Sequence, residues 1–123
     1  MKALSVHPKW AGLIAKGVKT LEVRSKNCRY RGPLLIVSSL RPAHPGVPSG
    51  HALCVVDVVG ARPMVESDAA AAHVPLVEGH FVWELANVRP LHFPHPVKGS
   101  LGLFNVSGDR LPPELRTAQL QPA

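Results

Sequence analysis

Apolar and polar residues form short blocks along the chain, and most of these blocks predict strands. Residues 20–24 alternate between polar and apolar side chains, which is the period of a strand with one polar and one buried face. Residues 34–37 and 52–59 are apolar almost throughout, as in strands that are buried on both faces. Three further blocks predict short strands, at residues 3–6, 81–88 and 101–106.

Helical signals are confined to two places. Pro8 stands where the first turn of a helix tolerates proline, apolar residues follow it at helical spacing, and Gly17 ends the pattern. Residues 66–73 start with an acidic, cap-like Glu-Ser-Asp run and continue with four alanines, which predicts a short second helix. Thirteen prolines and ten glycines argue against long helices after residue 17.

Five to six short strands and one or two helices, with no alternating strand–helix rhythm, predict a fold of the α+β class that is mainly β. The strands are expected to form a small sheet that curls into a barrel, with the helices at its rim. The domain is predicted to span residues 1–108. Residues 109–123 lose all periodicity and are expected to form a loosely ordered C-terminal extension.

Several classes of protein do not fit the sequence. Cys28 and Cys54 lie in unlike contexts, so we expect buried or free thiols and no disulfide. No apolar stretch approaches the roughly 20 residues of a membrane span, which predicts a cytoplasmic protein with no membrane contact. The seven histidines lack the spacing of a helical metal pair, so no metal and no other cofactor is expected. The pattern does not set the oligomeric state, and a monomer is compatible with it.

Positive charge is concentrated at the start of the chain. The formal net charge is +6, and residues 1–41 hold nine Lys or Arg residues but a single acidic residue, Glu22. The remaining residues carry more acidic than basic side chains. A positive field on one part of the molecule indicates an anionic partner.

Lys19, Glu22 and Arg24 form the first candidate site. On a strand, Glu22 and Arg24 project from the same face roughly 7 Å apart, and Lys19 can lean over them from the preceding turn. A carboxylate that accepts and a guanidinium that donates can read the edge of a nucleobase, while the lysine takes a phosphate or polarises a carbonyl. The alternative is a solvated strand face with a weak ion pair.

A second set of residues suits contacts to a nucleic-acid backbone, because basic side chains alternate there with an aromatic ring. A surface that merely keeps the protein in solution is the alternative. The predicted backbone contacts are Lys9, Lys26, Arg29, Tyr30, Arg31 and Arg41. The predicted contacts to the ligand itself, beside the three residues above, are His7, Trp10, Thr20 and Ser38. Trp10 could equally belong to the core.

Five segments in order along residues 1–106 resemble the ASCH domain of the PUA-like superfamily, in a small, stand-alone prokaryotic form. They lie at residues 3–11, 17–24, 30–36, 50–59 and 83–104, and the second carries a Gly-x-Lys-x-x-Glu-x-Arg motif. The resemblance implies a PUA-like β-barrel with helices at its rim and a cleft similar to RNA-binding clefts. It places the family's motif positions on Lys19, Glu22 and Arg24.

The resemblance also implies possible chemistry. The family includes small amidohydrolases that remove the acyl group from acetylated cytidine, with a lysine at the position of Lys19 and a threonine nucleophile at the position of Glu22. Their catalytic glutamate lies in the middle of the chain, where Glu66 and Glu78 are the candidates here. Other relatives are regarded as ribonucleases or as adaptors in larger assemblies.

Three functions remain open. The first is a module that recognises RNA or a modified nucleoside in a basic cleft. The second is a small hydrolase, either an acetylcytidine amidohydrolase or a ribonuclease, in which Lys19 is the base or polarises a carbonyl and Glu22 activates water or anchors the nucleoside. The third is a protein-interaction module.

Overall fold

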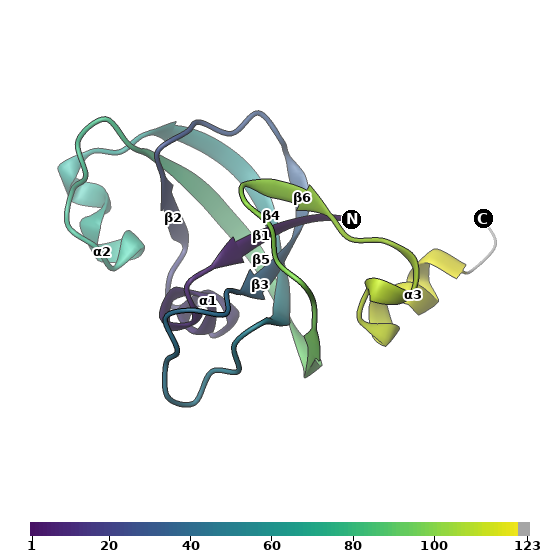
Figure 1. Ribbon diagram of the computed structural model, residues 1–123. Helices are drawn as coiled ribbons and strands as arrows, with labels where there is room; N and C mark the ends of the chain where they lie inside the picture. Colours follow the sequence, from purple (N-terminus) through teal and green to yellow (C-terminus); the bar gives the residue numbers. More distant parts are fainter. Residues whose placement is uncertain (121–123) are drawn as a thin grey trace.

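A computed structural model describes residues 1–120 of the protein, with side chains described through residue 116. Six strands form one sheet in the order β2-β5-β4-β3-β1-β6. The sheet curls into a half-barrel with short helices around it (Figure 1). The strands are β1 (Lys2–Val6), β2 (Leu21–Arg24), β3 (Gly32–Ser38), β4 (His51–Pro63), β5 (Phe81–Pro96) and β6 (Leu103–Asn105). The predicted fold class, mainly β with five to six strands, is confirmed.

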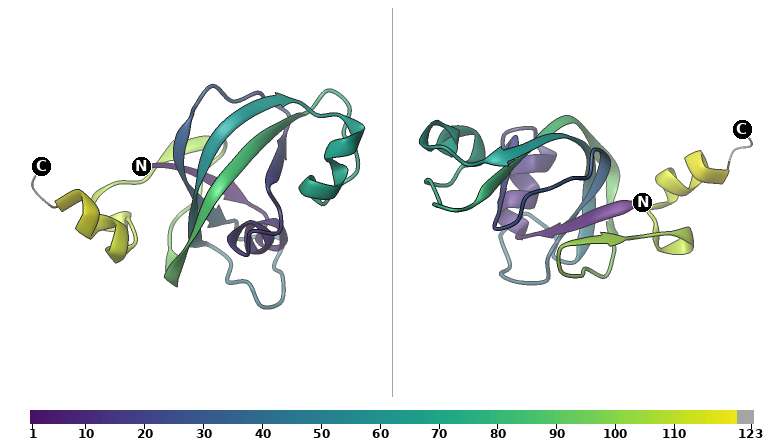
Figure 2. Two further views of the ribbon diagram at one scale, coloured as in Figure 1. Left: turned by 180° about the vertical axis from the view of Figure 1, so that it is seen from behind. Right: turned by 90° about the horizontal axis from the view of Figure 1, so that it is seen from above.

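The helices are short. They are α1 (Pro8–Ala15), α2 (Ala69–Ala72) and α3 (Pro113–Leu120), with single 3₁₀ turns at Glu66–Asp68 and Gly108–Arg110. Helix α1 lies against the concave side of the curled sheet, while α2 and α3 lie at opposite ends of the molecule (Figure 2). None of the helices in residues 1–120 is long and apolar enough to cross a membrane.

Strand β3 is buried on both faces, as its continuous apolar run predicts. Leu34 and Ile36 pack inside the curl with residues of α1, β4 and β5. Leu35 and Val37 point to the other face and pack with Val55, Val97 and residues near the C-terminus. Both free cysteines are buried, as expected. The alternation of one strand between two apolar clusters holds the centre of the sheet rigidly in place.

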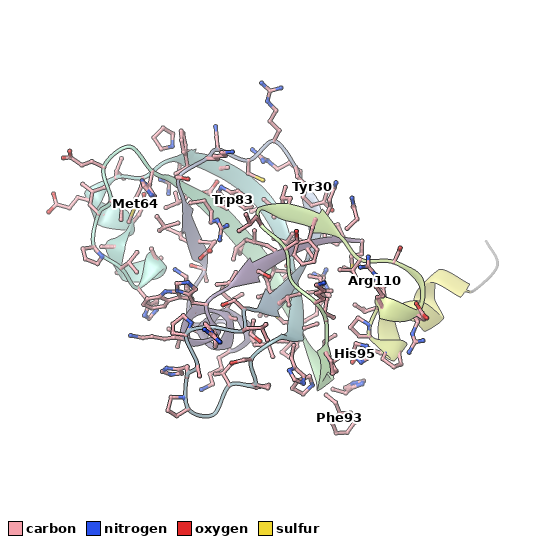
Figure 3. The ribbon with its side chains drawn as sticks, viewed as in Figure 1. Tyr30, Met64, Trp83, Phe93, His95 and Arg110 are labelled. Atoms are coloured by element: carbon pink, nitrogen blue, oxygen red, sulfur yellow. The ribbon has the colours of Figure 1, made fainter. Side chains whose placement is uncertain are left out.

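Strand β5 continues to Pro96, eight residues beyond its predicted end. Pro90 and Pro94 suggest a break, because proline has no N–H to donate to a neighbouring strand. However, β2 pairs only with Phe81–Glu84, so the later part of β5 has a partner on one side, β4, and a free edge on the other. Phe93 is 80% exposed and points away from the body near the end of this strand (Figure 3).

The predicted C-terminal extension, which starts at residue 109, contains regular secondary structure as far as residue 120. A 3₁₀ turn and α3 occupy this stretch. Leu111 is fully buried, Leu115 packs on the same apolar cluster, and Glu114 accepts a hydrogen bond from the backbone N–H of His92 at 3.0 Å. Leu111 and Leu115 have the i, i+4 spacing of a helix, but the two prolines between them make a helix hard to predict from the sequence. Residues 121–123 of the predicted extension lie outside the described residues, and the domain boundary at residue 108 stays a prediction.

Candidate functional site

A cleft of about 410 Å³ opens between β1 and β2. These two strands face each other across the curl (Figure 1), but β1 pairs with β3 and β6 and β2 pairs only with β5. One long contact crosses the gap, in which Arg24 Nη1 donates to the carbonyl oxygen of Ser5 at 3.5 Å. The cleft is lined by Ser5, Val6, His7, Trp10, Lys19, Glu22, Val23, Arg24, Ser39, Arg41, Val74, Ser100, Leu101 and Gly102.

Lys19 is placed by the turn between α1 and β2. Gly17 adopts a φ of 75°, which allows the chain to reverse after the helix, and the Lys19 N–H donates to the carbonyl of Leu13 at 3.2 Å. The side chain is 2% exposed. Its Nζ donates to the carbonyl oxygen of Ala72, at the end of α2, and lies 3.8 Å from Glu22 Oε1. The amine is thus held between a backbone carbonyl and a carboxylate.

Glu22 lies on β2 opposite Trp83 of β5, with its side chain 7% exposed. Arg24 Nη1 donates to Glu22 Oε2 at 3.3 Å. Burial raises the pKa of Glu22, against the opposing effect of Lys19, Arg24 and His7. Burial also lowers the pKa of Lys19, against the effect of Glu22. Both groups are therefore shifted toward their neutral forms.

A pair shifted in this way has flexible hydrogen-bonding capacity. A carboxyl with a raised pKa can hold a proton and donate it, or lose it and accept, within a narrow pH range. A lysine with a lowered pKa can serve as a base near neutral pH. The cleft therefore offers both donors and acceptors to a ligand, and two of these groups, Lys19 and Glu22, are themselves buried.

Trp10 supplies an aromatic wall. It is partly buried, packs against the inner apolar cluster and lines the cleft, so it belongs to both core and site. The ammonium groups of Lys9 and Lys19 lie 4.7 and 5.2 Å from the ring centroid. Arg41 also lines the cleft. Within the cleft, three cations and one carboxylic acid leave an excess of positive charge.

Two of the predicted ligand contacts lie elsewhere. Thr20 is exposed and outside the cleft, and its backbone N–H donates to Ala71 O at 3.2 Å. Ser38 is fully buried, and its hydroxyl donates to the carbonyl of Pro48. Its neighbour Ser39 lines the cleft instead. The strand ends at this point, so adjacent serines face different surroundings.

Most of the predicted backbone contacts also lie outside the cleft. Of these six residues only Arg41 lines it, and Lys9 stands beside it over the Trp10 ring. Several groups in the loop of residues 25–31 form hydrogen bonds within the protein. Arg31 Nη1 donates to Cys28 O at 2.8 Å, and the carbonyl of Lys26 accepts from Trp83 Nε1 at 3.0 Å. Lys26, Arg29 and Arg31 are exposed, and Tyr30 is partly buried, with its hydroxyl donating to Pro33 O at 2.5 Å.

Neither candidate for a mid-chain catalytic glutamate reaches the cleft. Glu66 and Glu78 are both exposed, and Glu22 is the single acidic residue among the described residues that line the site. In residues 1–120, no group of three or more His, Cys, Asp or Glu side chains is arranged to hold a metal ion. The protein groups available for chemistry are therefore Lys19, Glu22, Arg24 and His7.

Several residues of the cleft carry no signal in the sequence. Val74 follows α2, and Ser100, Leu101 and Gly102 belong to the loop between β5 and β6. Leu101 has the appearance of a strand residue but is 96% exposed. These residues come together only because the sheet curls, so no local pattern could have identified them.

The family assignment agrees with this fold. The family model for the ASCH domain matches residues 4–95, and the chain belongs to the ASCH domain family. Membership supports a nucleic-acid-related function in general terms. No curated protein matches the sequence.

Solved structures share the fold. The crystal structure of ASCH from Zymomonas mobilis is 14% identical, with a TM-score of 0.68 over 97% of this chain and 94% of that one. A tyrosine-to-phenylalanine mutant of the same protein is 13% identical, with a TM-score of 0.66 over 97% of this chain and 96% of that one. At this identity the likeness concerns the fold alone.

Proposed function

We propose that the protein binds RNA or a modified nucleoside in the cleft between β1 and β2. One observation carries the proposal: Trp10, Glu22 and Arg41, which supply a stacking face, a base-reading carboxyl and a cation, line one cavity with Lys19 and Arg24. A volume of about 410 Å³ suits a small organic ligand. ASCH family membership supports the nucleic-acid class of ligand.

In this proposal the base lies against Trp10 and its hydrogen-bonding edge meets Glu22. Stacking on an aromatic ring is tolerant of base identity, because every base has a π face. Glu22 supplies discrimination, since its raised pKa lets it donate or accept as the base requires. The phosphate or ribose lies toward Arg41, which is exposed at the mouth of the cleft.

Tryptophan fluorescence tests the proposal directly. Trp83 is 4% exposed, and its indole N–H donates to the backbone carbonyl of Lys26. A ligand in the cleft should therefore change the emission of Trp10 alone. We expect cytidine, N4-acetylcytidine or a short mixed-sequence RNA to change the signal, and Trp10→Phe to abolish the change. No response from any of the three in fluorescence and calorimetry would refute the proposal.

Charge reversal gives a matched pair of variants. Arg41→Glu changes a residue of the cleft wall, whereas Arg29→Glu makes the same change in the exposed loop outside it. Binding of RNA should weaken as salt rises, because phosphate contacts release counterions. If the cleft holds the phosphate, Arg41→Glu weakens binding and flattens this salt dependence more than Arg29→Glu. A larger effect of Arg29→Glu than of Arg41→Glu would indicate that the loop of residues 25–31, and not the cleft, contacts the phosphates.

A hydrolase is the second candidate, and the lowered pKa of Lys19 favours it. A buried lysine that is partly neutral can take a proton from water or a hydroxyl. Among the described residues that line the cleft, Glu22 has no second carboxylate beside it for this chemistry, which is why binding stands first. Release of acetate from N4-acetylcytidine, lost in Lys19→Met, would establish an amidohydrolase. Location in the cytoplasm and a monomeric state remain predictions.

A further inference from the structure

A second hollow continues from the cleft. This groove measures about 750 Å³ and lies between the end of β3 and the loop of residues 97–101. It shares Ser5, Ser39, Ser100 and Leu101 with the cleft. Because four residues line both hollows, the groove is directly adjacent to the cleft.

The chemistry of the groove differs from that of the cleft. Its walls include Leu40 and Leu101, which are 74% and 96% exposed, and Val97 forms part of its buried floor. Lys98 is its charged residue, and no acidic side chain lines it in the described part of the chain. An apolar surface with a cation beside it suits a flat, uncharged ring joined to an anion.

The position of Leu101 is the central observation. It borders both hollows and is almost entirely exposed, so its side chain stands between them. A Cβ placed on Gly99 would lie 2.3 Å from Ser5 Oγ, which shows how closely this loop approaches β1. Gly102 on the other side has a φ of 62°. These two glycines hold an apolar side chain out from the protein surface.

We propose that the ligand of the cleft is a single strand of at least two nucleotides, with the adjacent base in the groove and Leu101 inserted between the two bases. This inference rests on the proposed function. Leucine is among the side chains that proteins use as wedges between bases, where they replace one base face by an apolar surface. The connecting phosphate lies near Arg41, one of the three cations of the cleft, and Lys98, the cation of the groove.

A length series of small ligands tests the second base. The probes are cytidine monophosphate, the cytidine dinucleotide, and dinucleotides that are abasic at the 5′ or the 3′ position. The abasic forms keep the phosphate but lack one base, so they separate charge from stacking. Stacking of one base corresponds to about fivefold or more in affinity, and we expect the full dinucleotide to exceed both abasic forms by that factor.

Two variants of Leu101 then assign the effect to the wedge. Leu101→Ser should lower the affinity for the full dinucleotide by a larger factor than the affinity for cytidine monophosphate, because in this arrangement Leu101 contacts both bases of the dinucleotide but one base of the monophosphate. Leu101→Phe should increase that advantage, because an aromatic ring stacks better on a base. Val65→Ser is the matched control, since Val65 is 50% exposed and precedes the 3₁₀ turn at Glu66, outside both hollows. Thermal unfolding checks that each variant is folded.

The possible results separate this inference from the proposed function. Equal affinity for full and abasic dinucleotides, with cytidine monophosphate still bound, would overturn the second subsite and leave the cleft as a binding site. If Leu101→Ser weakens cytidine monophosphate as much as the dinucleotide, Leu101 is a wall of the cleft and the wedge is wrong. Failure of the wild-type protein to bind any probe would overturn the proposed function itself.

Discussion

Two clusters in this protein each pair a buried carboxyl group with basic side chains, but the pKa of the carboxyl group is shifted in opposite directions in the two. The cleft cluster consists of Lys19, Glu22 and Arg24, and the Asp68 cluster consists of Arg62, Asp68 and Glu84. Arg62 donates to both oxygens of Asp68 at 2.8 Å, and the Val65 N–H donates to Asp68 Oδ2 at 2.8 Å. These bonds lower the pKa of Asp68 to about 2. Burial raises the pKa of Glu22 instead.

The difference lies in how fully the protein satisfies each carboxylate. Asp68 has three short hydrogen bonds, so it is stable as an anion and has little capacity left for a ligand. Glu22 is equally buried but has a 3.3 Å bond from Arg24 and a 3.8 Å approach from Lys19. A buried carboxyl with unfilled hydrogen-bonding capacity favours binding over stability. This contrast distinguishes the candidate site from a structural ion pair.

The largest expected effect is on binding, from Lys19→Met. This change removes the amine but keeps an unbranched side chain of similar length in the space beside Trp10. We expect affinity for the nucleoside or RNA to fall by about 100-fold, or about 2.8 kcal/mol. Lys16→Met is the control, because Lys16 is exposed on the same helix end. Calorimetric titration measures both, and similar losses in the two variants would remove Lys19 from the site.

The next effect is on stability, from Asp68→Asn. The amide cannot accept the paired hydrogen bonds of Arg62 and the Val65 N–H together, so we expect a loss of about 2 kcal/mol in the free energy of unfolding. Asp109→Asn, at an exposed site, should have no measurable effect. Affinity measured well below the melting temperature should change by less than about twofold, which is well under the tenfold change that 1.4 kcal/mol represents. A large loss of affinity with no change in stability would reverse the roles of the two clusters.

Glu22→Gln should show the opposite balance. The amide keeps the shape but removes a charge that is costly to bury, so the free energy of unfolding should stay unchanged or rise by up to about 1 kcal/mol. Affinity should fall by about tenfold, because an amide cannot change between donating and accepting at one atom. Chemical denaturation and titration of the same preparation provide the two numbers. Marked destabilisation would show that Glu22 is a structural residue.

The smallest effect is the dependence of stability on pH, where the two carboxyls have opposite signs. Asp68 has a lowered pKa, so its stabilisation is complete above the unfolded value near 4 and is lost as the pH falls toward 2. Glu22 has a raised pKa, so its ionised form destabilises the fold above that pKa and the penalty disappears in acid. Thermal unfolding of wild type, D68N and E22Q from pH 2 to 8 measures both. Parallel curves for the three proteins would contradict both assignments.

The sequence predicts the sheet and the cleft cluster well, because both depend on short-range patterns. The alternation at residues 20–24 places Glu22 and Arg24 on one face, and continuous apolar runs identify β3 and β4. The later part of β5 escapes prediction, since prolines are tolerated there only because β2 is short. Helix α3 escapes because its apolar contacts are few and start beside prolines.

The composition of the cleft walls cannot be predicted in the same way. Charge counts treat Arg29 and Arg41 alike, yet only Arg41 reaches the cleft. Of the adjacent serines at 38 and 39, Ser39 lines the cleft and Ser38 does not, because position relative to the end of a strand decides the direction of a side chain. Leu101 contributes to the site through a loop whose place depends on the close approach of Gly99 to Ser5.

The absence of backbone pairing between β1 and β2 also bears on the width of the opening between them. In a closed barrel every strand edge is tied to its neighbour, so a change in the width of the opening disturbs the whole ladder. Here Arg24 Nη1 spans the opening by donating to Ser5 O, and it makes the one hydrogen bond between β1 and β2 in the described part of the chain. The width of this opening can therefore change without breaking a backbone hydrogen bond between the two strands that border it.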